Sequence, residues 1–185
     1  MTIRIGVTGH RILADLEKID AGVEIALRHI ESAFPGEPLT VISALAEGAD
    51  RIVARHVLAR PDAGLTVPLP LAKSDYLADF QSEDSRADFL SLLQRADHLE
   101  EMPSAATREQ GYEAAGEYVL NNSEVLIAIW DGRNAQGQGG TGEIVARARQ
   151  RGLPIAWVHA GNREPATNRP TSLGDEQGRV TFENI

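Results

Sequence analysis

The sequence predicts an α/β fold, a single domain in which helices cover both faces of a parallel sheet of about six strands. Three observations predict it. The chain has 185 residues, of which 42% are hydrophobic and 24% charged, which is typical of one soluble globular domain. Short apolar runs alternate with segments of helical period along almost the whole chain. Because strand–helix–strand crossovers are right-handed, this alternation indicates a Rossmann-like layout.

The predicted strands are short runs rich in β-branched and other apolar residues. They are Ile3–Thr8, Thr40–Ala44, Leu65–Leu69, His98–Met102, Val125–Trp130 and Pro154–His159. The fifth run reads VLIAIW and is apolar throughout, which is typical of a central strand that helices bury on both faces. The first run begins IRIGV and also fits the middle of the sheet.

Apolar residues at helical spacing predict the helices between these strands. The first helix presents one apolar face, made by Ile19, Val23, Leu27 and Ile30. The second presents Ala49, Ile52, Val53, His56 and Val57. The last presents Ile144, Val145 and Ala148. Gly152 followed by Pro154 is a helix-stop signal, so we expect the last helix to end there.

The remaining segments are the stretch 72–95 and the end of the chain. The stretch 72–95 predicts a short helix followed by a longer one. Its large apolar side chains are expected to close over one end of the sheet, and they are Tyr76, Phe80, Phe89 and Leu93. Beyond Ala160 polar turn formers predominate, so we divide the chain into a domain over residues 1–160 and a loose, polar C-terminal arm over residues 161–185. The last residues, RVTFENI, are expected to add a strand, either within the chain or to a partner subunit.

Composition excludes several classes of protein and site. The sequence has no cysteine, which rules out disulfides and thiolate metal sites, and its five histidines show no metal-ligand spacing. We therefore expect no metal and no resident cofactor. The formal charge of −9 argues against general affinity for nucleic acid or an anionic membrane, but it leaves room for a local basic pocket. No apolar stretch approaches the roughly 18 residues of a membrane span and no signal peptide is evident, so we expect a cytoplasmic protein.

Polar and glycine-rich turns follow several predicted strands, at the sheet edge where doubly wound proteins bind their ligands. The first turn lies in GVTGHR and offers Gly6, Thr8, Gly9, His10 and Arg11 as ligand contacts. Arg11 can bind a phosphate through its guanidinium fork, and His10 can donate a hydrogen bond or stack on a base. The alternative is that the two glycines relieve crowding between strand and helix while Arg11 is solvated.

Two further turns follow the second and fifth strands. In SALAEGAD, the candidate ligand contacts are Ser43, Glu47 and Gly48, while Asp50 begins the next helix. The alternative is a turn of small residues in which Asp50 is only a first-turn acid. Asp131 follows VLIAIW directly and can bind a ribose or orient another side chain, or it can be an ordinary turn aspartate.

The glycine loop QGQGGTGE is the strongest single signal. Gly139, Gly140 and Gly142 permit close backbone approach, Thr141 offers a hydroxyl, and the helix that follows points its N–H groups at the same place. The loop is neither a Walker A loop nor a GxGxxG motif. Glu143 lies in the first helical turn, where it can accept hydrogen bonds from sugar hydroxyls or act on a glycosidic centre. The alternative is that Glu143 only interacts favourably with the positive end of the helix dipole.

These motifs resemble those of a known superfamily. VISALAEGADRIVARHVL resembles the turn and helix of DNA-processing protein A, and VLIAIWDGRNAQGQGGTGEIVARARQRGLPIAWV resembles the GGxGTxxE region of the LOG family. LOG proteins are phosphoribohydrolases that release a cytokinin base from its nucleoside monophosphate. Together with GVTGHR, these segments resemble the SLOG superfamily over about residues 2–160, with a more distant likeness to nucleoside deoxyribosyltransferases. The resemblance implies a Rossmann-like nucleotide-binding domain and, because LOG proteins are dimers, a homo-oligomer.

The sequence departs from the LOG pattern at two places. Thr141 is followed by Gly142 and then Glu143, whereas LOG proteins carry their acidic residue further beyond the threonine. The catalytic arginine that the LOG family has on the helix before the fifth strand is missing here, since Arg108 lies too early in the chain and Ala115 stands near the expected position. These departures weaken the assignment of phosphoribohydrolase activity and leave the nucleotide pocket intact.

Three functions follow, in decreasing order of support. The first is binding of a nucleotide or nucleoside phosphate at the carboxyl edge of the sheet, as in a sensor. The second is an N-glycosidase, phosphoribohydrolase or glycosyl transferase that acts on a nucleotide, with Glu143 as the catalytic carboxylate. The third is binding of single-stranded DNA, which a charge of −9 and an aromatic content of 5% disfavour.

Overall fold

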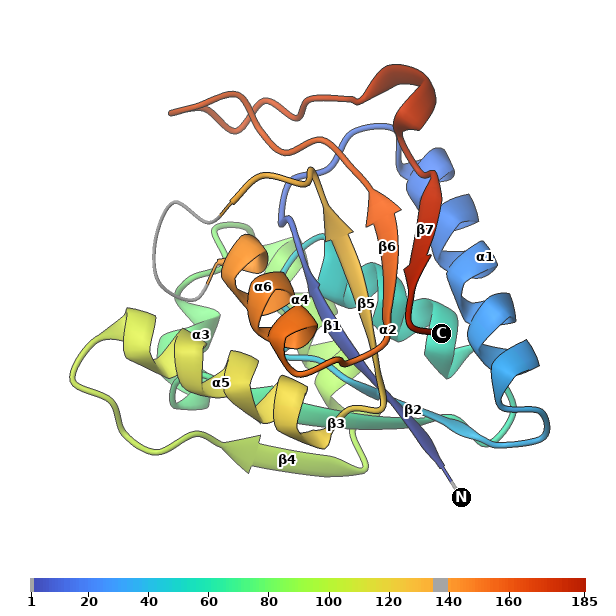
Figure 1. Cartoon of the computed structure of the whole chain (residues 1–185). Helices are drawn as coiled ribbons and strands as arrows, with labels where there is room; N and C mark the ends of the chain where they lie inside the picture. The colour runs from blue at the N-terminus through green and yellow to red at the C-terminus, as the bar shows by residue number, and fades with distance from the viewer. Residues whose placement is uncertain (1, 135–139) are drawn as a thin grey trace.

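The computed structural model describes residues 2–134 and 140–185, and within them seven strands form a single sheet (Figure 1). The strands are β1 Ile3–Gly9, β2 Leu39–Ile42, β3 Gly64–Leu69, β4 His98–Glu101, β5 Val125–Trp130, β6 Ile155–His159 and β7 Val180–Glu183. All six predicted strands are present, and their ends shift by two residues at most. The predicted α/β fold is therefore confirmed.

The strand order places β1 and β5 side by side at the centre of the sheet. It runs β4-β3-β2-β1-β5-β6-β7, and the first six strands in this order are parallel. The chain leaves β1 toward β2 on one side and leaves β5 toward β6 on the other. Such a reversal between neighbouring parallel strands opens a crevice beyond their carboxyl ends.

The seventh strand adds to the predicted number of about six. β7 pairs antiparallel with β6, and Glu183 lies opposite Ile155. The arm returns to the same edge of the sheet without a crossover helix, so its strand must run antiparallel. Of the two outcomes expected for the final residues, the structure shows pairing within the chain.

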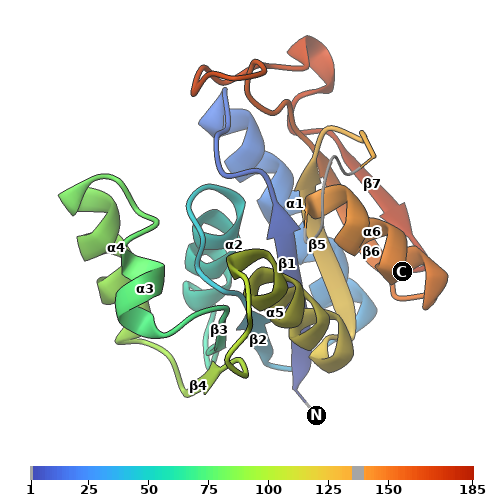
Figure 2. The ribbon, with the colours of Figure 1, turned by 90° about the vertical axis from the view of Figure 1, so that its left-hand side faces the viewer.

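Helices cover both faces of the sheet. They are α1 Leu16–Ala33, α2 Ala49–Leu58, α3 Lys73–Leu77, α4 Glu83–Leu93, α5 Arg108–Asn122 and α6 Thr141–Gln150, with a short 3₁₀ helix, η1, at Gly174–Glu176. Figure 2 shows α1 to α4 on one face and α5 and α6 on the other. Every helix within the described ranges is too short or too polar to cross a lipid bilayer.

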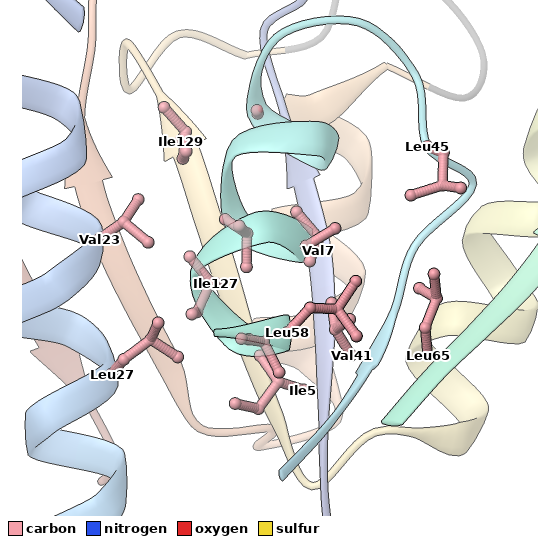
Figure 3. Packing of buried hydrophobic residues seen from close by; sticks show 14 of the residues in the cluster. Ile5, Val7, Val23, Leu27, Val41, Leu45, Leu58, Leu65, Ile127 and Ile129 are labelled. Carbon is pink, nitrogen blue, oxygen red and sulfur yellow. The ribbon is translucent and has the colours of Figure 1, made fainter. Parts of the chain in front are cut away.

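Alternate residues of the central strands supply two separate cores. Val7 of β1 and Ile127 of β5 belong to the larger core, which α1 and α2 cover (Figure 3). Leu126 and Ala128 of β5 point to the opposite face and pack with α5 and α6. Burial on both faces explains why VLIAIW carries no polar residue.

The apolar faces that the sequence predicts are largely buried. The residues of the α1 face that are 0% exposed are Ile19, Val23, Leu27 and Ile30. The stretch 72–95 folds into the expected short and longer helix, and Tyr76, Phe80 and Phe89 are also 0% exposed, with Tyr76 ring centroids 5.0 and 5.5 Å from the other two. Leu93 is only partly buried.

Candidate functional site

A cleft of about 1000 Å³ opens beyond the carboxyl ends of β1 and β5. Gly9 and His10, which end or follow β1, line it on one side, and Trp130 and Asp131 from the end of β5 line it on the other. This is the crevice that the reversal of strand order creates. The segments that follow the two central strands therefore meet at one site.

The cleft brings together most of the predicted contacts. The predicted residues that line it are Gly9, His10, Arg11, Glu47, Asp131, Gly140, Thr141 and Gly142. The other predicted residues that the structure describes are not among the lining residues, and they are Gly6, Thr8, Ser43, Gly48 and Glu143. Gly139 lies outside the described residues.

Three of the predicted glycines have packing roles. A Cβ on Gly6 would lie 2.5 Å from Oγ of Ser123, at the end of α5. A Cβ on Gly9 would lie 2.4 Å from Cβ of Ala49, so β1 and the start of α2 can approach only without a side chain there. Gly48 has a φ of +76°, and a Cβ on it would lie 2.4 Å from the carbonyl oxygen of Arg11. Gly9 and Gly48 therefore allow the first and second turns to approach closely, and Gly9 also borders the cleft.

Ser43 also stabilises its own turn. It is 0% exposed, and its hydroxyl donates to Oδ2 of Asp50 at 2.8 Å and accepts from the N–H of Leu45 at 3.0 Å. Burial raises the pKa of Asp50 to about 6, while the Ser43 hydrogen bond and the charges of Arg11 and Arg51 act against that rise. The second turn thus contains a buried polar pair, and Glu47 of the same turn lines the cleft.

His10 and Asp131 form the floor of the cleft. The backbone N–H of Asp131 donates to Nε2 of His10 at 3.1 Å, and Asp131 Oδ1 lies 3.3 Å from the same nitrogen. Burial lowers the pKa of His10, and the neighbouring carboxylate offsets only part of this effect. Because Nε2 accepts a hydrogen bond, neutral His10 carries its proton on Nδ1.

Three arginines line the cleft, and two of them have no carboxylate partner. Arg133 lies 3.9 Å from Asp131. Within the described residues, no carboxylate oxygen lies within 4.0 Å of the guanidinium of Arg11 or of Arg163. Arg11 lies over the ring of Tyr112, 5.3 Å from its centroid. The chain carries a charge of −9, so two arginines that line a cleft with no carboxylate within 4.0 Å among the described residues are a favourable place for an anion.

The start of α6 contributes backbone donors to the same cleft. α6 begins at Thr141, its N-cap is Gly140, and no side chain caps it within the described residues. The first N–H groups of a helix have no partner within the helix, and the helix dipole favours negative charge at this end. Gly140, Thr141 and Gly142 border the cleft. An anion in the cleft can therefore contact both backbone N–H groups and arginine.

The side chain of Glu143 pairs with an arginine one turn further along α6. Its Oε1 lies 2.5 Å from Nη2 of Arg147, which also pairs with Glu113 and Glu117 of α5. The hydrogen bonds that Arg147 donates to Glu113, Glu117 and Glu143 raise the pKa of its guanidinium above the usual value. The carboxylate of Glu143 thus belongs to an ion-pair cluster that joins α5 to α6.

Sequence reasoning missed two parts of the cleft wall. Asp79, Gln81 and Ser82 come from the link between α3 and α4, and no local motif marks them. Asn162 and Arg163 come from the arm directly after β6. The rule that ligands bind beyond strand ends applies to β6 as well, so these two residues were detectable from the sequence.

Asp79 is bound by side chains of α5. Its Oδ1 accepts from Arg108, and its Oδ2 accepts from the hydroxyl of Tyr112. Arg108 is the residue that the LOG comparison placed too early in the helix. Here it holds the carboxylate of Asp79 at the cleft wall, and Tyr112 connects the same carboxylate to Arg11.

Comparison with known proteins assigns no family to the chain. No protein-family model matches the sequence, and no curated protein matches it. Within the described residues, no three histidine, aspartate or glutamate side chains gather in a way that could hold a metal ion. The function is therefore inferred from the geometry and charge of the cleft.

Proposed function

We propose that this chain is a SLOG-like domain that binds a nucleotide or nucleoside phosphate in the cleft, as a sensor does. One observation carries the proposal. Arg11 and Arg163 line a cleft at the reversal of strand order and have no carboxylate within 4.0 Å among the described residues. Ligands of doubly wound sheets bind at this position, and guanidinium groups are well suited to phosphate.

The residues that line the cleft offer donors suited to a phosphate and acceptors suited to hydroxyl groups. The N–H groups at the start of α6 and the guanidinium of Arg11 supply donors for a phosphate. The carboxylates of Asp131 and Glu47 border the same cleft and are acceptors for ribose hydroxyls. A nucleoside phosphate carries both kinds of group on one small molecule.

Binding is tested by isothermal titration calorimetry with AMP, GMP, CMP and UMP and with the corresponding nucleosides. We expect at least one nucleotide to bind, and to bind more tightly than its nucleoside. Arg11→Ala should weaken nucleotide binding about tenfold, the order expected for one charge-assisted hydrogen bond. Arg28→Ala, which removes an exposed arginine paired with Glu24, is the control and should have no effect. If the native protein binds none of these nucleotides, the proposal is wrong.

The enzyme alternative has a separate test. Chromatography of each nucleotide after incubation with the protein detects release of the free base. An N-glycosidase releases base, and Glu143→Gln abolishes the release if Glu143 is the catalytic carboxylate. A sensor binds the nucleotide and returns it unchanged. We expect binding without turnover, since Glu143 pairs with Arg147 and is not among the residues that line the cleft.

The proposal includes two features beyond the ligand. We propose that the protein is cytoplasmic and, because the LOG proteins that the sequence resembles are dimers, that it forms a homo-oligomer. Size-exclusion chromatography with light scattering measures the oligomeric state directly, and a mass of 20.0 kDa would identify a monomer and contradict this part of the proposal.

A further inference from the structure

The first part of the C-terminal arm is an ordered hairpin. Its two sides are joined by an antiparallel bridge between Arg163 and Pro170. The N–H of Thr171 donates to the carbonyl oxygen of Asn162 at 2.6 Å, and the N–H of Glu164 donates to that of Arg169 at 2.9 Å. Residues 162–171, which we call the arm hairpin, therefore have a defined backbone.

Gln177 fixes the base of the arm hairpin to the domain. This side chain is 3% exposed, and its Oε1 accepts from the N–H groups of Gly161 and Leu173 at 2.9 and 3.0 Å. Its Nε2 donates to the carbonyl oxygen of Ala14, in the loop after β1, at 2.9 Å. The arm is therefore attached to the loop that carries Arg11. Figure 1 shows the arm crossing beyond the carboxyl ends of the central strands.

The arm hairpin faces the cleft without contributing a side chain to either hydrophobic core. Its residues that line the cleft are Asn162, Arg163, Pro165, Ala166 and Asn168. Ordering a polar segment costs conformational entropy that its apolar contacts do not offset. Such a segment is typical of a binding loop.

Arg163 is the residue of the arm hairpin best suited to bind a ligand. Its Nη1 donates to Oδ1 of Asn168 at 3.2 Å, and both residues line the cleft. No carboxylate lies within 4.0 Å of it among the described residues. Its neighbour Arg169 is paired with Glu164 at 3.4 Å and does not line the cleft. The two arginines of the hairpin therefore differ in both position and charge balance.

We propose that the arm hairpin is a wall of the ligand site and that Arg163, like Arg11, binds the phosphate of the nucleotide. This inference rests on the proposed function, since it names a residue of the same site. The arm is then part of the binding domain, and a domain limited to residues 1–160 has an incomplete site.

The test compares Arg163→Ala with Arg169→Ala, the matched control on the same hairpin. The probe is whichever of AMP, GMP, CMP and UMP the native protein binds most tightly, together with its nucleoside. We expect Arg163→Ala to raise the Kd for the nucleotide about tenfold and to leave the Kd for the nucleoside unchanged, because only the charge-assisted contact to phosphate is lost. Arg169→Ala should change neither Kd by more than about twofold. Equal melting temperatures of the two variants would show that the fold is intact.

The outcomes separate this inference from the proposed function. If the native protein binds nucleotide and the two variants bind it equally, the role of Arg163 is wrong and the proposed function stands. If Arg163→Ala weakens the binding of nucleotide and of nucleoside equally, Arg163 does not bind the phosphate and the inference is again wrong. If the native protein binds no nucleotide, both proposals fail.

Discussion

The backbone N–H of Asp131 donates a hydrogen bond to Nε2 of His10 across 121 positions of sequence. The bond joins the loop after β1 to the loop after β5 at the floor of the cleft. It also determines the tautomer of the imidazole, since the nitrogen that accepts this bond cannot carry the proton. Both the stability and the geometry of the cleft therefore depend on neutral His10.

We predict that the contribution of His10 to stability decreases at acid pH. At pH 7.5, His10→Ala should lower the free energy of unfolding by about 1–3 kcal/mol, because it leaves the N–H of Asp131 unpaired. Burial lowers the pKa of folded His10 below the unfolded value of about 6.5. As the pH falls below the unfolded value, the unfolded chain binds a proton more readily than the folded chain, so native stability decreases.

Urea unfolding between pH 7.5 and pH 5 measures this effect. The difference between the native protein and His10→Ala should shrink as the pH falls. His98→Ala is the control, because His98 lies exposed on the edge strand β4. A difference that does not change with pH would contradict the predicted role of the buried imidazole.

We predict that Gly48 is required mainly for packing. Gly48→Ala should destabilise the protein by about 3 kcal/mol or more, since it combines a strained positive φ with collisions against the carbonyl oxygens of His10 and Arg11. Gly36→Ala is a matched control, because Gly36 has a φ of +80° and open space around it. It should cost only about 1–2 kcal/mol, the strain of the backbone alone. Equal losses in urea unfolding would show that the collisions at Gly48 relax without cost.

We predict that Gln177 holds the arm against the domain. Gln177→Leu leaves the N–H groups of Gly161 and Leu173 and the carbonyl oxygen of Ala14 without their partner, so we expect a loss of about 2 kcal/mol or more. It should also expose the arm hairpin to trypsin at Arg163. Lys18→Ala removes an exposed tether to Gly174 and should cost less than about 1 kcal/mol. Arm cleavage at the same rate in both variants would contradict the role of Gln177.

The centre of the sheet was predictable because β5 is buried on both faces. VLIAIW forms β5 at the predicted residues, and the α1 face of Ile19 and Val23 is fully buried as expected. Apolar spacing did not indicate α5, because two of its four buried positions are the small residues Gly111 and Ala115. Its packing depends on close approach, since a Cβ on Gly111 would lie 2.3 Å from the carbonyl oxygen of Pro70.

The candidate site was predictable in location and only partly in composition. Glycines and polar residues after strands indicated the carboxyl edge of the sheet, and His10, Arg11, Asp131 and Thr141 do line one cleft. The roles of single residues depended on distant partners. Glu143 pairs with Arg147 on the same helix, and Asp50 accepts a hydrogen bond from the hydroxyl of Ser43. No sequence pattern reveals which of two nearby polar groups a carboxylate or hydroxyl will meet.

The order of apolar and polar residues was sufficient to specify the α/β class and the edge of the sheet that holds the cleft. The periodicity of apolar residues along the chain indicates which face of each helix or strand is buried, and this periodicity is a local property of the sequence. Only the folded chain decided that the arm hairpin and the link between α3 and α4 complete the cleft, and that β7 joins β6. Contacts between residues far apart in sequence depend on how whole elements pack, and that packing is a property of the complete chain.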